Sequence, residues 1–408
     1  MSMRRFFHLS ENRNIAMFYL LTASLNMWFV AGVWIFIWGK FMTNQEIGIS
    51  DAMTFAFALL LELPSGVIAD LIGRKRAIVF GHICMVLGTA CLAAAGSFWG
   101  ITLAYALWTF GYAFQSGTTE ALAYDSLTKE QQKNDWSRII GTSVIIRRIT
   151  SLTCTALGGF LFAVHFRLPY SVMAVLGIIG IIAALALREQ KVSHKHNLRE
   201  LATYTNQIRD GVGVLLHKAI WPVAITALVV MGVDYMYNWG LLRPLTALRF
   251  GYDEVTIPLL QSFTSIIVIG SILLLPKLRR RIGTVRFLFM AAVLFGASFA
   301  SFFLPLSWVI GGLAVIAMAV LGMYVEQLFS VFINARTKSE HRATTLSTVS
   351  LIIKIPYVAL AIITGILADQ NQLAPFSLGV GVFVLAVCLI GLVAYRRLPL
   401  AAKSAKAI

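Results

Sequence analysis

The chain has 408 residues, of which 58% are hydrophobic and 13% are charged, and its mean hydropathy is +0.79. A soluble domain has about half apolar and a quarter charged residues, so this composition excludes a soluble globular protein and indicates an integral membrane protein. The net charge of +16 comes without a basic recognition motif, which argues against nucleic-acid binding and favours basic residues in cytoplasmic loops.

Runs of about 20 apolar residues predict membrane-spanning helices, and about twelve such runs follow one another. The segment Met1–Asn14 is polar and basic, and the run after it is too long for a signal peptide, so no cleavable signal is expected. The expected fold class is therefore all-α and integral to the membrane. The expected spans are 15–40, 50–71, 76–96, 98–126, 138–164, 169–187, 218–242, 257–278, 284–305, 307–334, 343–368 and 374–395.

Lys and Arg residues are concentrated in every second connector. The rich set is Arg4, Arg5, Arg13, Arg74, Lys75, Arg76, Lys129, Lys133, Arg138, Arg188, Lys191, Lys195, Arg199, Lys277, Arg279, Arg280, Arg281, Arg286, Arg336, Lys338, Arg342, Arg396, Arg397, Lys403 and Lys406. The alternate connectors contain Lys40, Arg167, Arg243 and Arg249. Because cytoplasmic loops collect basic residues, an even number of spans places both termini in the cytoplasm.

The longest connector, 188–217, divides the chain into two expected six-helix bundles, 1–187 and 218–408, the second of which ends in a short basic tail. Apolar residues recur in the connector at near-helical spacing. They are Leu198, Leu201, Ile208 and Val212. The connector is therefore either an amphipathic helix on the membrane surface or a solvated linker.

A weak internal repeat supports two related halves. Ile72-Gly73-Arg74 follows the second expected span, and Ile282-Gly283-Thr284 follows the eighth. Two halves with matching loop positions are typical of many transporter folds.

Charged side chains inside spanning helices cost about 2.5–3.5 kcal/mol on insertion scales, so they are usually paired or functional. Asp70, Arg74 and Asp125 are expected to meet at the cytoplasmic ends of the second and fourth spans. There, opposite charges form charge-assisted hydrogen bonds.

A second set of charges lies deeper in the first half. Arg147 and Arg148 are midway along the fifth span, with Glu62 and Glu120 at similar depths. One arginine is expected to pair with a carboxylate, and the other to face an aqueous cavity. The set is either a neutralised buried network or a proton-coupling device, in which a carboxylate exchanges a proton for an arginine.

The second half carries Glu326 on the tenth span and Lys354 on the eleventh, which form the best candidate ion pair there. Other polar side chains could line a substrate cavity, although aromatic ones more often pack or lie at the membrane interface. The cavity candidates are Asn26, Gln115, Asp234, Tyr237 and Asn238.

The segment from Gly66 to Arg76 resembles the signature of the major facilitator superfamily, between its second and third spans. Glu62-Leu63-Pro64-Ser65 and the segment 116–125 resemble a bacterial branch of that superfamily. Length, span number, sidedness and the central connector agree with this resemblance, which covers essentially the whole chain.

The resemblance implies two pseudo-symmetric bundles and a monomer in the prokaryotic inner membrane. It also implies gating roles for the signature residues, which are Gly66, Asp70, Gly73, Arg74 and Asp125. Their cluster would touch the start of the eleventh helix, near Arg342–Leu346, and latch the two halves together. The alternative is a static salt bridge that sets topology.

Two departures from exporters of this superfamily concern the direction of transport. The fourth span has Tyr112, Ala113 and Gln115 where proton-coupled exporters carry an arginine. The fifth span keeps Gly158 and Gly159, but Cys154-Thr155 replaces the usual Gly-Pro.

The function expected from the resemblance is secondary transport of a small organic solute by alternating access, driven by protons. Drug or metabolite efflux is the first expectation, and uptake of a small organic solute or lipid flipping is the alternative. Arg147, Arg148 and Lys354 would suit an anionic or zwitterionic solute, whereas Glu62, Asp234 and Glu326 would suit a cation.

The sequence argues against the other classes of function. Nucleotide-binding and hydrolase motifs are missing, and the number of spans argues against a photoreceptor with Lys354 as its Schiff base. The four cysteines have no metal-ligand spacing. We therefore expect no enzyme activity, cofactor or metal, and the expected partners are a small-molecule substrate, protons and membrane lipids.

Overall fold

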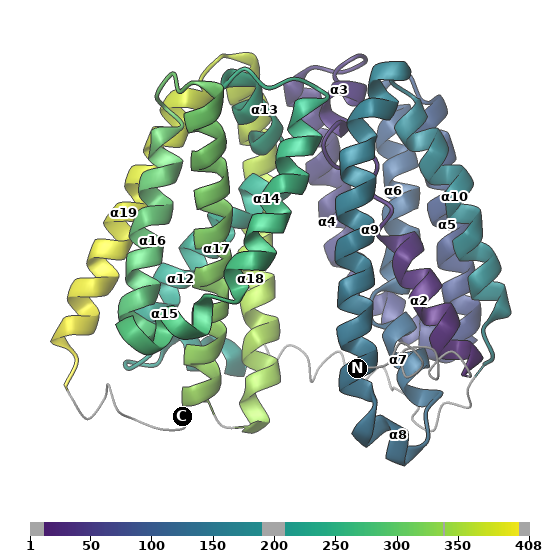
Figure 1. Cartoon of the computed structure of the whole chain (residues 1–408), viewed down its shortest axis with the longest axis horizontal. Helices are drawn as coiled ribbons and strands as arrows, with labels where there is room; N and C mark the ends of the chain where they lie inside the picture. The colour runs from purple at the N-terminus through teal and green to yellow at the C-terminus, as the bar shows by residue number, and fades with distance from the viewer. Residues whose placement is uncertain (1–11, 190–208, 338, 400–408) are drawn as a thin grey trace. The chain divides into compact units, whose positions relative to one another are not determined.

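The computed structural model describes residues 12–189, 209–337 and 339–399, and the regular elements within them are all α-helices (Figure 1). By length and composition, seven of these helices could cross a membrane, and up to ten spans result if each of three bent pairs counts as one. The all-α membrane class is therefore confirmed.

Nine expected spans correspond to single helices, whose bounds differ from the expected ones by a few residues. They are α4 (Asn44–Ile72), α5 (Arg74–Ala94), α9 (Trp136–Val164), α10 (Leu168–Ala186), α12 (Trp221–Trp239), α16 (Thr284–Ser301), α17 (Trp308–Arg336), α18 (Ser339–Asp369) and α19 (Leu373–Arg397). Of these, α4 is bent by 51° where Pro64 interrupts it.

Each of the other three expected spans contains two helices separated by a break. They are α2 (Arg13–Leu25) with α3 (Trp34–Trp38), α6 (Phe98–Gln115) with α7 (Thr118–Asp125), and α14 (Thr256–Ile272) with α15 (Leu275–Ile282). Ser116 is extended and Gly117 has φ +75°, so the chain leaves the helical conformation between α6 and α7. The total of twelve spans stays a prediction.

Three short helices lie in segments expected to be connectors. They are α8 (Lys129–Asn134), α13 (Leu242–Arg249) and a helix at Arg209–Leu216 that is bent by 115° from α12. Most of the expected surface helix or linker, including Leu198, Leu201 and Ile208, lies outside the described residues, as does the basic tail beyond Pro399.

The chain divides into two compact units. Unit 1 contains 1–42, 53–200 and 254–262, and unit 2 contains 43–52, 201–253 and 263–408. The segment Thr43–Ala52, which includes the start of α4, therefore belongs to unit 2, whereas Glu254–Ser262 belongs to unit 1. The expected bundle boundaries at 187 and 218 remain a prediction.

In unit 1, α5 packs against α6 and α10 (Figure 1). Glycines bring the α5 and α6 backbones into contact. A Cβ on Gly111 would lie 2.4 Å from the carbonyl oxygen of Gly81, and one on Gly88 would lie 2.6 Å from the amide nitrogen of Trp108. Small residues at such crossings are typical of helix association in membranes.

In unit 2, α16 packs against α17 and α19 (Figure 1). Its core is aromatic. The fully buried rings of Phe295 and Phe299 lie along α16 and that of Phe302 directly follows its last residue. Tyr237 from α12 stacks on Phe302 with ring centroids 5.6 Å apart. This aromatic core fixes α12 beside α16.

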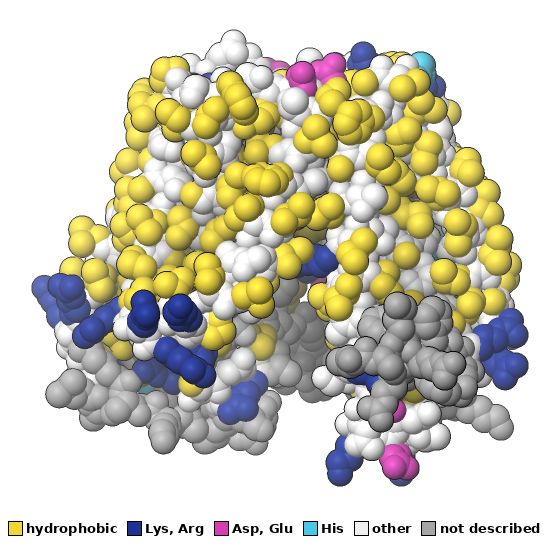
Figure 2. All heavy atoms as spheres, viewed as in Figure 1, with side chains coloured by type: hydrophobic (Ala, Val, Ile, Leu, Met, Phe, Trp, Pro, Cys, Tyr) yellow, Lys and Arg dark blue, Asp and Glu magenta, His cyan; other side chains and the backbone are white. Residues whose placement is uncertain are grey.

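Large apolar side chains cover the outside of both units. Leu60 is 74% exposed, Val164 77% and Leu273 81%, which a lipid environment explains better than water. Figure 2 shows hydrophobic side chains over α16 and α17, and basic side chains gathered at the end marked by α15. Such a segregation is expected of membrane-spanning helices with charged ends.

Candidate functional site

The turn between α4 and α5 requires a glycine. Gly73 begins α5 with φ +100°, a backbone conformation that side-chain-bearing residues rarely adopt. Gly283 begins α16 with φ +88° and a similar ψ. The repeat noted in the sequence therefore corresponds to the same turn at both places.

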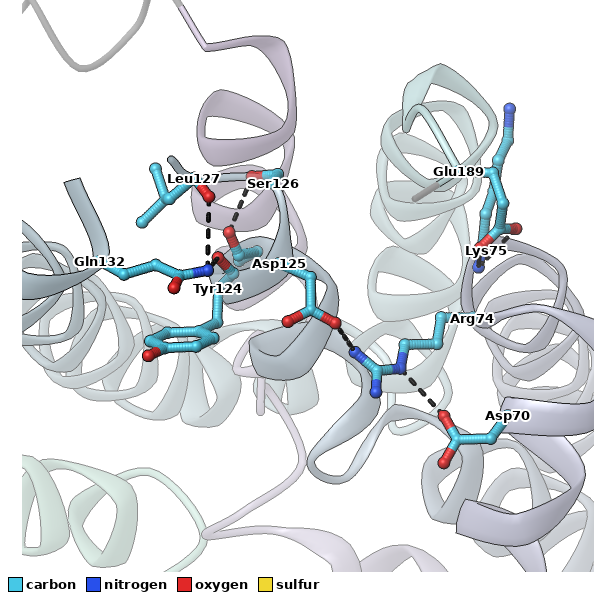
Figure 3. Close-up of polar contacts among 10 residues, drawn as sticks. Asp70, Arg74, Lys75, Tyr124, Asp125, Ser126, Leu127, Gln132 and Glu189 are labelled. Atoms are coloured by element: carbon cyan, nitrogen blue, oxygen red, sulfur yellow. Dashed lines mark hydrogen bonds and ion pairs between the residues drawn. The ribbon is translucent and has the colours of Figure 1, made fainter. Parts of the chain in front are cut away.

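Arg74 joins the signature carboxylates. Its Nε donates to Asp70 at 3.0 Å, and its Nη1 donates to Asp125 at the end of α7 (Figure 3). The side chains of Asp70 and Arg74 are each 15% exposed, so the pair is shielded from most solvent. The structure thus brings together the three charges that the sequence predicts to meet, and we call them the Asp70 network.

Glu189, at the end of α10, is a participant that the sequence reading missed. It accepts from the backbone N–H of Lys75 at 3.1 Å (Figure 3). A carboxylate is favourable at a helix N-terminus, where unpaired N–H groups carry partial positive charge. Next to it, Asn14 exchanges two hydrogen bonds with the backbone of Arg188, so the ends of α10 and α2 are held beside the turn.

Gly66, by contrast, has free space around its Cα. A Cβ built on it would meet no atom within 4 Å. Packing within the described residues does not require a glycine here, and the gating role of Gly66 stays a prediction.

The deeper charges of unit 1 are exposed. Glu120 lies on α7 and Arg147 and Arg148 lie on α9, and among the described residues none of the three forms an ion pair. The expected pairing of one arginine with a carboxylate is therefore not formed within the part of the chain that the structure describes. Arg147 lies within electrostatic range of Tyr112 on α6, and Glu62 is exposed on α4.

Two of the cavity candidates have local structural partners. Gln115 is 3% exposed and donates to the carbonyl oxygen of Ile78 at 2.7 Å, which ties α6 to α5. Asn26 ends α2 and donates to the carbonyl oxygen of Thr22 at 2.8 Å. Both hydrogen bonds suit a structural role, and contact with substrate remains a prediction.

The other three cavity candidates, Asp234, Tyr237 and Asn238, lie together on α12. A fourth residue, Arg243 of α13, joins them. Arg243, which the sequence reading placed in a connector, begins α13 and donates to Asn238 Oδ1 at 3.2 Å. Asn238 donates to the backbone carbonyl of Asp234 at 3.0 Å. We call Asp234, Tyr237, Asn238 and Arg243 the α12 cluster.

Glu326 approaches this cluster from α17, since it acts electrostatically on Asp234. Gly322, one turn earlier on α17, makes room for the carboxyl group, because a Cβ there would lie 2.6 Å from Asp234 Oδ1. Lys354 is half-buried on α18. Its pairing with Glu326 stays a prediction.

A contact between α4 and α18 was also missed. The hydroxyl of Tyr357 donates to the carboxylate of Asp51, and both side chains are buried. At the start of α4, Asp369 accepts from the backbone N–H of Asn44 at 3.1 Å and of Gln45 at 2.8 Å. Asp51 could have been noticed as an acidic residue inside an apolar run.

No group of three or more His, Cys, Asp or Glu side chains that could hold a metal ion occurs among residues 12–189, 209–337 and 339–399. Cys84, Cys154 and Cys388 are buried, and Cys91 is exposed.

Apolar helices long enough to cross a membrane, with a charged network at a tight interhelical turn, are the features of a multi-pass membrane protein. A family model described as "Major Facilitator Superfamily" matches residues 16–347, and the chain belongs to that family. It is therefore a secondary transporter and not an enzyme.

Solved structures of this fold agree. The nucleoside transporter NupG has a TM-score of 0.72 at 15% identity, covering 95% of this chain and 99% of its own. An auto-inhibited peptide transporter of the POT family has a TM-score of 0.70 at 13% identity, covering 95% and 98%. A bacterial homologue of the human lysosomal transporter Spinster has a TM-score of 0.69 at 15% identity, covering 97% and 98%.

A sequence relative is known in Buchnera aphidicola subsp. Schizaphis graminum (strain Sg). This uncharacterized transporter is 26% identical over 147 residues, which is 35% of this chain and 36% of the relative. The match thus spans about a third of the relative's length.

Proposed function

We propose that this transporter moves a small organic solute by alternating access, coupled to protons, and that it exports drugs or metabolites. The Asp70 network carries the gating part of this proposal. Two carboxylates share one arginine at a turn that only glycine accommodates, an arrangement suited to forming and breaking as helices move. The proposed location is the inner membrane, with both termini cytoplasmic and the protein monomeric.

Ionisable side chains within the spans support proton coupling. Asp234 and Glu326 act on one another in unit 2, and intramembrane carboxylates commonly mark proton relays. Both would also suit a cationic substrate such as a cationic drug.

Uptake of a polar solute is the second candidate. Arg147 and Arg148 are exposed and form no ion pair among the described residues, so they are available to an anionic or zwitterionic solute. The likeness to a nucleoside transporter and a peptide transporter is consistent with a solute of that size.

The test uses proteoliposomes that contain the purified protein and a trapped pH-sensitive dye. Ethidium, uridine and dialanine serve as cationic, neutral and zwitterionic probes, each under an imposed pH gradient. We expect ethidium to move against the protons in wild-type liposomes and not in empty ones. Solute movement without a pH change would contradict the coupling, and transport of uridine or dialanine in the direction of the protons would favour uptake.

A further inference from the structure

The α12 cluster contains two buried polar atoms that have no hydrogen-bond partner among the described residues. They are Asp234 Oδ1 and the hydroxyl oxygen of Tyr237. Tyr237 lies three residues after Asp234, so the two side chains are neighbours on one helix. Unsatisfied buried polar atoms are rare in folded proteins and call for an explanation.

Close packing holds the side chains of Asp234 and Tyr237 in place. Gly322 on α17 leaves space for the carboxyl group, since a Cβ there would lie 2.6 Å from Oδ1. Tyr237 is held by Phe299 and Phe302, with ring centroids 6.0 and 5.6 Å away. The unsatisfied atoms are therefore fixed in place by their neighbours.

Charges of both signs act on Asp234. Arg243 approaches from α13 and Glu326 from α17, while Asn238 is a polar side chain on α12 itself that bonds to the backbone of Asp234.

The other helices packed on α12 present aromatic groups near this point. α18 provides Tyr357, which packs on Tyr235, and α16 provides Phe299. From α19, Gly391 contacts α12 at Thr226, two turns before the carboxyl group.

Asn238 keeps the guanidinium close without placing it on the carboxylate. Arg243 donates to Asn238 Oδ1, and Asn238 Nδ2 donates to the backbone carbonyl of Asp234. A small movement of α13 relative to α12 would bring Arg243 to Asp234 or take it away. The protonation of a carboxyl group depends strongly on the distance to such a charge.

We propose that Asp234 is a proton-binding site of this transporter, with Arg243 as the counter-ion that replaces the proton. On binding, an O–H bond forms at Oδ1 from a solvent proton, and the carboxyl group becomes neutral. On release, the carboxylate is compensated by Arg243, which α13 carries. A metal cation fits less well, because Ca²⁺ for example takes about 6–8 oxygen ligands.

This proposal rests on the proposed proton coupling and assigns it to residues that the sequence reading considered only as a substrate-cavity site. It makes α13 the element that responds to the proton. Tyr237 carries the other unsatisfied atom one turn along the same helix, and no hydrogen bond joins its hydroxyl to Asp234 Oδ1 among the described residues.

Infrared difference spectroscopy of the purified protein, titrated with acid in the absence of any solute, tests the site directly. We expect a carbonyl band of a protonated carboxylic acid that is lost in Asp234→Asn and kept in Asp210→Asn, an exposed aspartate of the same unit. In Arg243→Gln the band should persist to more alkaline pH, because the competing cation is gone. An identical band in wild type and Asp234→Asn would overturn the proposal.

Proteoliposomes separate this proposal from the proposed function. With ethidium as probe, Asp234→Asn should lose accumulation driven by a pH gradient, whereas Asp210→Asn should keep it. If protons still drive accumulation in Asp234→Asn, the assignment of Asp234 as the proton-binding site is wrong. If wild-type liposomes show no proton-driven transport, the coupling itself is refuted, whatever the infrared band shows.

Discussion

Arg74 is a residue whose chemistry cannot be replaced by charge alone. It donates through two different nitrogen atoms, to Asp70 and to Asp125. A guanidinium offers several donors in a fixed plane, whereas a lysine is a single mobile charge. The network therefore depends on an arginine between two carboxylates, on three different helices.

The first prediction concerns Asp70→Asn. The amide keeps the size of the side chain and loses the charge that Arg74 binds, so we expect transport to fall by about tenfold or more, a change of about 1.4 kcal/mol, with normal expression and insertion. Flux in membrane vesicles under an imposed gradient measures it, with Glu130→Gln on α8 as the control. Wild-type flux in Asp70→Asn would remove the gating role.

The sequence was informative for this network because Asp70 and Arg74 lie in a short, charged segment between two apolar runs, and Asp125 lies at the end of another apolar run. Glu189 was missed because it acts through a backbone N–H, which has no sequence signal. Arg243 was taken for a connector residue, since α13 has only eight residues and follows an apolar span. Partners that arise from such short helices cannot be read from hydropathy.

Among the helices, α5 and α6 pack closely in unit 1, with Gly81 and Gly111 facing each other. Their apolar runs predicted both helices, but not that α6 would end at Gln115. Hydropathy averages over many residues, whereas the end of this helix is decided by one glycine with a positive φ.

The second prediction is that Gly111→Leu destabilises unit 1. A Cβ at this position meets the Gly81 backbone at 2.4 Å, and overpacking usually costs about 1–3 kcal/mol. The midpoint of thermal unfolding of the purified protein should fall. Gly141→Ala, at a site with no atom within 4 Å, should leave it unchanged, and equal midpoints for both variants would contradict the packing.

The third prediction concerns the start of α4. Asp369 accepts from two backbone N–H groups there, and loss of such a cap costs about 0.5–2 kcal/mol. Asp369→Ala should therefore increase amide hydrogen exchange in residues 44–46, while Gln370→Ala should not. Unchanged exchange in Asp369→Ala would show that the carboxylate does not hold the helix end.

At the scale of the whole molecule, the sequence predicted the membrane class and the family correctly, since both depend on features spread along the chain. A bent element precedes each of the two glycine turns: α4, bent by 51°, precedes Gly73, and α14 with α15, bent by 53°, precedes Gly283. The internal repeat therefore extends beyond the glycines. The exchange of short segments between units 1 and 2 could not be predicted, because it depends on contacts distant in sequence.

The fourth prediction is that the basic connectors lie in the cytoplasm. In a cysteine-free background and intact cells, a membrane-impermeant maleimide should label Lys40→Cys and Gln372→Cys but not Lys133→Cys or Arg280→Cys. Permeabilised cells provide the control, in which all four should react. Labelling of Lys133→Cys and Lys40→Cys alike in intact cells would refute the proposed topology.

The paired glycine turns have a consequence for how the protein could be re-engineered. Counting back three residues from Gly73 reaches Asp70, whereas the same step from Gly283 reaches Arg280, and Arg74 is matched by Thr284. The duplicated turn thus carries an acidic and a basic residue in its first copy, and a basic and an uncharged residue in its second. Replacing Arg280 by Asp and Thr284 by Arg would give both turns the same pair of charged residues. Comparing transport by this variant with transport by the wild type would show what the difference between the two turns contributes.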